Sequence, residues 1–258
     1  MPRAVVLELA GEKHPRYLGR YAHGLFFALL RELDPDLSEA LHAAPRKPFT
    51  LTPLPAGENR LFLRFATLDD GLFTRFLLGL VEKAPTGLPL GDTDFRLTRV
   101  LADPRGHPLA GAHRWEELRD REGLREATLC FLTPTVFITS KAEGRTRYTP
   151  LPDPRLILFS LLDKWQAHSP FPYTPKEEGA LRAIFELDTE IKAFRNLRFH
   201  RVWAGKASFP GFTGEVTLRL WQEAWEARLA LGRLAALAFY SGVGAKTPFG
   251  MGLALARP

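Results

Sequence analysis

The first hundred residues alternate between short apolar runs and longer segments in which apolar residues recur every three or four positions. Residues 4–10 (AVVLELA) form an apolar run typical of a buried strand. Residues 15–33 place six apolar side chains on one face of a helix. This helix is predicted to end at Asp34, because the residue before a proline avoids helical backbone angles. A short second helix is expected over 36–42.

The remaining segments of this half complete one supersecondary pattern. Candidate strands at 48–54 and 60–66 are joined by the turn-rich sequence PAGEN, which predicts a hairpin. Asp69 or Asp70 caps a helix that reaches Lys83, and residues 94–102 are expected to form a closing strand. The order β-α-β-β-α-β is that of the ferredoxin-like unit, so an α+β fold is predicted.

The second half repeats this order more loosely. It follows a segment rich in proline and glycine, 103–123, which we interpret as a linker. Strands are then expected within 124–140, 184–203, 212–220 and 251–256, and helices over 154–168 and 222–240. We therefore predict two tandem ferredoxin-like domains, residues 1–118 and 119–258.

The charge of the chain favours an anionic partner. The 35 basic residues outnumber the 29 acidic ones, and 26 of the 35 are arginines. Guanidinium groups suit phosphate and stack on bases, so nucleic acid is the leading class of partner. Asn, Gln, Met and Cys are scarce, which is typical of thermophilic proteins. A structural protein whose arginines reflect only thermal adaptation is therefore a competing interpretation.

Membrane, disulfide and metal chemistry are all disfavoured. No apolar stretch approaches the roughly 20 residues of a membrane span. The N-terminus has only a brief apolar run, so we expect a cytoplasmic protein without a membrane partner. The single cysteine, Cys130, can form neither an internal disulfide nor a cysteine-based zinc site. Because the histidines show no HxH or HExxH spacing, we expect no metal and no other cofactor.

The most distinctive motif is the segment 241–252, SGVGAKTPFGMG. It fits neither standard phosphate loop, because Thr247 and Ala245 stand where those patterns need glycine. It also follows a predicted helix and precedes a predicted strand, the reverse of a nucleotide loop. Two interpretations remain open: a tight turn, or a loop whose backbone N–H groups and lysine contact an RNA backbone. The RNA-contacting residues would then be Gly242, Gly244, Lys246, Gly250 and Gly252.

This loop and two N-terminal segments, 34–42 (DPDLSEALH) and 47–52 (KPFTLT), carry a resemblance to a known family. The chain resembles the Cas-six family of CRISPR-associated endoribonucleases, which process precursor CRISPR RNA. The resemblance implies two ferredoxin-like domains that bind a CRISPR repeat RNA, expected as a stem-loop, and cut it once without metal. The 2′-hydroxyl attacks the adjacent phosphate and leaves a 2′,3′-cyclic phosphate or 3′-phosphate and a 5′-hydroxyl. Such a reaction needs a base, an acid and a cation.

The resemblance also implies which residues are catalytic. His42 matches the family's catalytic histidine, and an ordinary imidazole titrates near neutral pH. Lys47 lies where the family often keeps a cation, and Arg46 lies beside it, so either is a candidate to balance the charge of the phosphorane.

One position departs from the family pattern. Phe27 stands where some members carry a tyrosine that completes the catalytic trio, and a phenyl ring cannot exchange a proton. His23, one helical turn earlier, is the expected substitute, which would give a pair of histidines for acid and base. Tyr21 and Tyr17 are weaker substitutes.

Basic and aromatic residues interleave in the predicted strand 184–203. Strand alternation places residues 195, 199, 201 and 203 on one face and 192, 194, 198 and 200 on the other. Arg195, Arg198 and Arg201 are expected to contact RNA, and arginines at 119, 121, 125, 145 and 147 would extend the basic surface. We expect an endoribonuclease, with a non-catalytic repeat-RNA-binding subunit of a CRISPR effector complex as the alternative. A homodimer and membership of such a complex are both left open.

Overall fold

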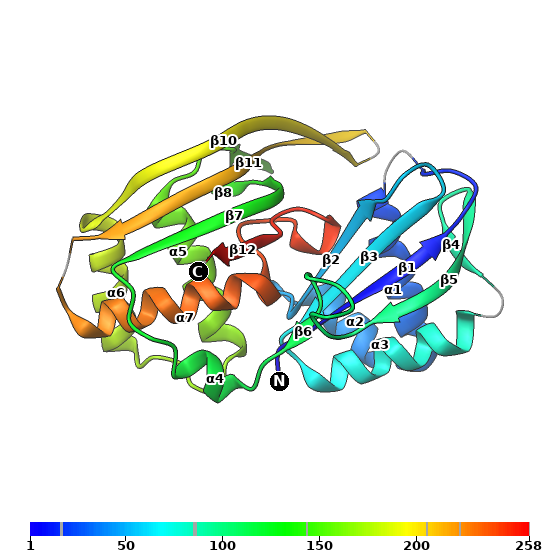
Figure 1. Ribbon diagram of the computed structural model, residues 1–258, viewed down its shortest axis with the longest axis horizontal. Helices are drawn as coiled ribbons and strands as arrows, with labels where there is room; N and C mark the ends of the chain where they lie inside the picture. Colours follow the sequence, from blue (N-terminus) through cyan, green and yellow to red (C-terminus); the bar gives the residue numbers. More distant parts are fainter. Residues whose placement is uncertain (16–17, 85–86, 143, 205, 222, 258) are drawn as a thin grey trace. The chain divides into compact units, whose positions relative to one another are not determined.

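The computed structural model describes residues 1–15, 18–84, 87–142, 144–204, 206–221 and 223–257, and it divides into two units (Figure 1). Unit 1 comprises Met1–His113, Ala204–Lys206 and Pro248–Gly250. Unit 2 comprises Arg114–Trp203, Ala207–Thr247 and Met251–Pro258. The predicted boundary after residue 118 falls inside helix α4 (Trp115–Arg119), which belongs wholly to unit 2.

Unit 1 has the predicted order of elements with two short added strands. Its elements are β1 (Arg3–Ala10), α1 (Leu18–Leu33), α2 (Pro35–Ala43), β2 (Phe49–Pro55), β3 (Arg60–Thr67), α3 (Asp70–Lys83), β4 (Leu88–Leu90), β5 (Thr93–Leu101) and β6 (Gly111–Ala112). The sheet runs β2-β3-β1-β5-β4, with β6 paired to β1. Neighbouring strands are antiparallel, and β1 pairs with β3 from Arg3↔Thr67 to Ala10↔Arg60. Without β4 and β6, this is the ferredoxin-like arrangement.

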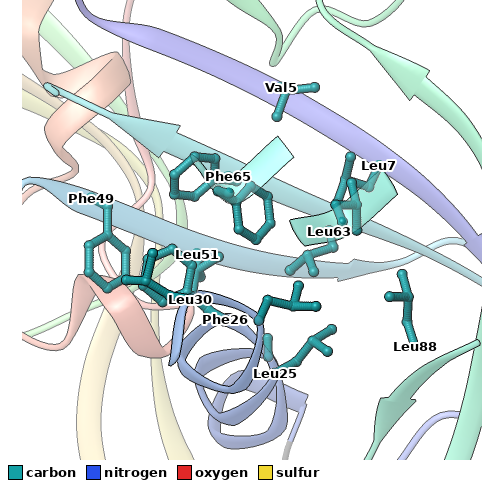
Figure 2. Packing of buried hydrophobic residues seen from close by; sticks show 14 of the residues in the cluster. Val5, Leu7, Leu25, Phe26, Leu30, Phe49, Leu51, Leu63, Phe65 and Leu88 are labelled. Atoms are coloured by element: carbon teal, nitrogen blue, oxygen red, sulfur yellow. The ribbon is translucent and has the colours of Figure 1, made fainter. Parts of the chain in front are cut away.

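The core of unit 1 lies between its sheet and the apolar face of α1. Figure 2 shows Leu25, Phe26 and Leu30 of α1 among apolar side chains of the sheet. The ring centroids of Phe26 and Phe49 lie 4.2 Å apart in a stacked pair, and both side chains are 1% exposed. This apolar face follows the spacing of three and four that predicted the helix. Burial of such aromatic side chains is the main stabilising contribution to a core of this kind.

The first part of the segment predicted to be a linker, up to His113, packs against the sheet of unit 1. Strand β6 pairs with β1, and the backbone N–H of His113 donates to the carbonyl of Pro2. Arg64 of β3 is fully buried, and its Nε donates to the carbonyl oxygen of Leu109 at 2.9 Å. The boundary between the two units, after His113, falls inside this segment, and the residues before it are held by strand pairing and buried contacts that composition does not register.

Unit 2 repeats the ferredoxin-like order. After α4 it contains β7 (Glu126–Thr135), β8 (Phe137–Ala142), β9 (Arg145–Thr149), α5 (Pro154–His168), α6 (Pro175–Leu187), β10 (Thr189–Ala204), β11 (Ala207–Leu220), α7 (Trp225–Ser241) and β12 (Ala254–Arg257). The main sheet runs β10-β11-β7-β12, and β8 and β9 form a separate two-stranded sheet. The helices α5 and α7 lie along one face of the main sheet (Figure 1). The two units together confirm the predicted fold of tandem ferredoxin-like domains.

Two parts of unit 2 differ from the sequence-based prediction. Residues 184–187 end helix α6 rather than begin a strand, and α6 starts at a capping box in which Thr174 and Glu177 bond each other's backbone N–H groups. In β10, Asn196 has a φ of 52°, which interrupts the extended backbone. Near Asn196, side chains from both predicted faces of the strand are exposed. The alternation of the sequence therefore does not identify a single charged face.

Candidate functional site

Helix α2 carries His42 in its last turn, and sequence signals at both ends define the helix. Asp34 caps the N-terminus by accepting the N–H of Leu37 at 3.0 Å, and Pro35 occupies the first turn. Leu41 is 7% exposed and anchors the helix in the core. The next residue, His42, is exposed, so its imidazole is accessible to a ligand.

Lys47 holds the C-terminal end of this helix. Its Nζ donates to the carbonyl oxygens of Leu41 at 2.6 Å, His42 at 2.9 Å and Ala44 at 2.9 Å. Burial of the ammonium lowers the pKa of Lys47 below its ordinary value. An ammonium has three N–H donors, and here three carbonyls accept them. In this arrangement Lys47 fixes the backbone of His42. Its three N–H donors are used by these carbonyls, so the same donors do not contact a phosphate.

Phe27 brings the two candidate histidines to one place. Its ring centroid lies 4.8 Å from that of His23 and 5.4 Å from that of His42, both in edge-on geometry. Phe27 is 7% exposed and belongs to the core of unit 1, so its position is fixed by packing. The residue that replaces the family tyrosine is therefore a common support for both imidazoles.

His23 has a second aromatic neighbour from the C-terminal part of the chain. Its partly buried imidazole stacks on Phe249 with a centroid distance of 4.0 Å, within unit 1. A Cβ on Gly19, one helical turn before His23, would collide with the carbonyl oxygen of Phe249. Gly19 therefore allows this close approach. Tyr21 packs against the same core, and Tyr17 lies outside the described residues.

The glycines of the loop 241–252 serve the loop's own conformation. Gly242, Gly244 and Gly252 have φ values of 62°, 78° and 76°, which favour glycine. Their N–H groups donate within the protein, to the carbonyl of Ala238, to the Ser160 hydroxyl and to the carbonyl of Pro134. These intramolecular hydrogen bonds favour the tight-turn interpretation for the three amides. The sequence could not show them, because loop composition does not show where each N–H donates.

Two polar residues of α5 hold this loop, and the sequence analysis did not identify them. Ser160 Oγ accepts the N–H of Gly244 at 2.8 Å. Lys164 Nζ donates to the carbonyl oxygens of Ser241 at 3.0 Å and Gly242 at 2.8 Å. Burial lowers the pKa of Lys164 to about 7, and the nearby Asp163 opposes this shift. The available signal was their spacing of four residues, which puts both on one face of an apolar helix.

Lys246 lies beside aromatic and basic residues of the neighbouring hairpins. Its φ is 62°, and its Nζ lies 5.0 Å from the ring centroid of Phe209 in β11. Tyr148 of β9 packs edge-on against Phe209 at 5.4 Å. Burial first, and the charge of Lys141 second, lower the pKa of Lys246. Gly250 lies in unit 1, where its φ is 90° and a Cβ would lie 3.1 Å from Pro53.

The predicted RNA-contacting arginines lie along β10. Arg195, Arg198 and Arg201 are exposed, and their guanidinium groups form neither a hydrogen bond nor an ion pair with any residue that the structure describes. Exposed aromatic side chains share this strand: Phe194, Phe199 and Trp203. Arg46 is also exposed, beside the His42 helix.

Among the residues that the structure describes, no three or more His, Cys, Asp or Glu side chains gather where they could hold a metal ion. None of the helices in this part of the chain is long and apolar enough to cross a membrane.

Comparison with known proteins decides the family. The family model described as "CRISPR-associated endoribonuclease Cas6" matches residues 129–254. A solved structure described as "Cas6 (TTHB231) product complex" is 68% identical, with a TM-score of 0.96 and coverage of 100% of both chains. This chain belongs to the Cas6 family. The family predicted from residues 34–52 and the glycine-rich loop is thereby confirmed.

Other Cas6 structures are similar over the same length. "Thermus thermophilus Cas6 (TTHB231)" is 64% identical, with a TM-score of 0.81 and coverage of 100% of this chain and 98% of the other. "Cas6 (TTHA0078) product complex" is 32% identical, with a TM-score of 0.84 and coverage of 100% and 99%. A comparison with curated protein sequences found no match. The roles of individual residues in this Cas6 chain stay predictions.

Proposed function

We propose that this chain is a metal-independent endoribonuclease that binds CRISPR repeat RNA and cleaves precursor CRISPR RNA once per repeat. Membership of the Cas6 family supports the reaction class. Relatives described as product complexes and as a substrate mimic complex support RNA as the ligand. The observation that carries the proposal is the contact of His23 and His42, two groups able to transfer protons, with the same phenyl ring.

Two imidazoles supply both proton transfers of the reaction. One accepts the proton of the 2′-hydroxyl as its oxygen attacks the adjacent phosphorus. The bond from phosphorus to the 5′ oxygen breaks, and the other imidazole donates a proton to that oxygen. The products are a 2′,3′-cyclic phosphate, which water can open to a 3′-phosphate, and a 5′-hydroxyl. No metal takes part in these steps.

We assign Lys47 and Arg46 different parts in this reaction. Lys47 positions His42, because its ammonium donates to the carbonyl of His42 and to two neighbouring carbonyls. Arg46, which is exposed beside it, balances the charge of the phosphorane in this proposal. The arginines of β10 bind RNA and take no part in the proton transfers.

The test is cleavage of an end-labelled repeat RNA from the source's own CRISPR array, in EDTA, under single-turnover conditions. We expect one cut with wild type, a fall of at least about 100-fold with His42→Ala and a smaller fall with His23→Ala. A substrate with 2′-deoxyribose at the cut site should not be cleaved. His14→Ala is the matched control, because His14 contacts Gly57 and Phe95 instead of Phe27.

The other outcomes select between the alternatives. Tight binding without a cut would favour the non-catalytic subunit. The presence of Phe27, where some family members carry a tyrosine, also favours that interpretation. Cleavage that stops in EDTA, or that is unchanged in His42→Ala, would contradict the proposed mechanism. Neither binding nor cleavage would leave the structural protein as the remaining interpretation.

A further inference from the structure

The hairpin β8–β9 is an addition to the fold that its core topology does not require. It lies between β7 and α5 in sequence and forms its own two-stranded sheet, outside the order β10-β11-β7-β12. Its base is anchored, because Phe137 is 3% exposed and its ring centroid lies 6.3 Å from that of Phe212. Its far end is exposed. A well-anchored, exposed hairpin is suited to binding.

Two arginines share one face of this hairpin. Arg145 pairs with Ala142 and Arg147 pairs with Ser140 across the strands. Residues two apart on a strand point the same way, about 6.6 Å apart along it. Arg145 and Arg147 are both exposed.

Among the described residues of unit 2, Arg145 and Arg147 differ from most arginines in having no carboxylate partner. Most arginines of this unit are held by carboxylates, as in Arg155 with Glu186 and Arg257 with Glu215. Within the described part of the unit, five guanidinium groups make neither a hydrogen bond nor an ion pair. All five lie on the two hairpins β8–β9 and β10–β11: Arg145, Arg147, Arg195, Arg198 and Arg201. Charge without an acidic partner is therefore concentrated on two adjacent hairpins of one unit.

The two hairpins differ in their aromatic side chains. On β10, the arginines alternate with exposed aromatic residues, as in Phe199 and Trp203, on which bases can stack. On β9, the aromatic residue Tyr148 is partly buried and its ring packs against Phe209. The face with Arg145 and Arg147 therefore presents charge without a surface for stacking. Such a face contacts phosphates and cannot distinguish bases.

We propose that Arg145 and Arg147 form a sequence-independent binding site for the RNA phosphate backbone, separate from the arginine and aromatic residues of β10. This proposal rests on the RNA binding in the proposed function and adds a second contact surface to it. Each guanidinium takes one phosphate and releases counterions. The hairpin thus adds affinity for any RNA that reaches it, whereas selection of the repeat lies elsewhere.

The experiment measures RNA affinity at several NaCl concentrations for wild type and Arg145→Ala/Arg147→Ala. Two RNAs are used, the repeat and an RNA of the same length and stem pairing with permuted bases. We expect the variant to bind both RNAs more weakly by the same factor. The slope of log affinity against log salt should fall in magnitude by about 1 for each arginine removed.

The control removes the same charge from paired arginines. Arg155→Ala/Arg257→Ala loses two positive charges that are already held by Glu186 and Glu215, so its salt slope should match wild type. A wild-type slope in Arg145→Ala/Arg147→Ala, or a larger loss for the repeat than for the permuted RNA, would overturn the proposal. Binding by wild type without cleavage would defeat the proposed catalysis but leave this proposal testable by the same slopes. Absence of salt-sensitive binding by wild type would overturn both.

Discussion

The Nζ of Lys47 lies 2.9 Å from the carbonyl oxygen of His42, so a side chain predicted to act on phosphate is bonded to the backbone of the candidate catalytic residue. The same ammonium also bonds the carbonyls of Leu41 and Ala44. These carbonyls belong to the end of α2, where the helix leaves backbone acceptors without partners. Lys47 therefore affects the reaction through the position of His42.

Lys47→Met should lower both stability and activity. Loss of these hydrogen bonds should reduce the free energy of unfolding by about 1–3 kcal/mol, because a charged donor and several backbone acceptors lose their pairing. The cleavage rate should fall in parallel as His42 loses its support. Urea denaturation and single-turnover cleavage measure the two effects. Lys13→Met is the control, since Lys13 forms only an exposed pair with Asp92.

A direct contact between the Lys47 ammonium and the phosphate would give a different result. If its ammonium balanced the phosphate charge, Lys47→Met would lower the cleavage rate while stability stayed at the wild-type value. Lys47→Arg would then keep most of the rate, because the charge is retained. The positioning role is supported if Lys47→Met loses stability and Lys47→Arg restores neither the stability nor the cleavage rate.

The sequence predicted the elements whose signals are local. The Asp34-Pro35 start of α2 and the apolar spacing of α1 depend on neighbouring residues, so both helices and His42 were placed correctly. The chemistry of the site was less accessible. The contacts of Lys47 with carbonyls and of Phe27 with two imidazoles depend on how separate segments pack, which periodicity does not encode.

The segments that were missed are short or have mixed signals. Hairpin β8–β9 turns at Gly144, whose φ is 72°, but its strands are too polar for an apolar pattern to reveal them. Helix α6 carried a readable capping box at Thr174 and Glu177, which the strand prediction over 184–203 overlooked. The contacts of Ser160 and Lys164 join residues about 80 positions apart, so no local pattern predicts them.

Phe27→Leu should weaken the site more than the fold. Removal of the ring should lower the free energy of unfolding by about 1–3 kcal/mol, as for other large-to-small changes in a core. The cleavage rate should fall as well, because both imidazoles lose the surface that they share. Phe73→Leu is the matched control: Phe73 is also 7% exposed, but its ring packs on Phe65. Equal cleavage by the two variants would refute the supporting role of Phe27.

Lys164 should make stability depend on pH in the alkaline range. Burial lowers the pKa of Lys164 from 10.5 to about 7 in the folded protein. Between these values the unfolded state binds the additional proton, so this group makes stability rise as pH increases from 7 to 10.5. The rise is at most about 1.4 kcal/mol for each pH unit.

Comparison of wild type with Lys164→Met isolates this contribution. The variant also loses two hydrogen bonds, which changes stability at every pH. The difference in slope between pH 7 and pH 10, measured by urea denaturation, therefore reports the titration of Lys164 alone. Parallel slopes would show that the pKa of Lys164 is not lowered.

Gly244→Ala should destabilise unit 2 through a close backbone approach. Gly244 has a φ of 78°, and a Cβ there would collide with the carbonyl oxygen of Val136. Gly57→Ala is the matched control, because Gly57 has a φ of 87° but open space around its Cα. Both variants should lose about 1 kcal/mol from backbone strain, and Gly244→Ala should lose at least about 1 kcal/mol more from the collision. Equal losses in urea denaturation would mean that Gly244 is needed only for its backbone angle, and that the loop can shift away from Val136.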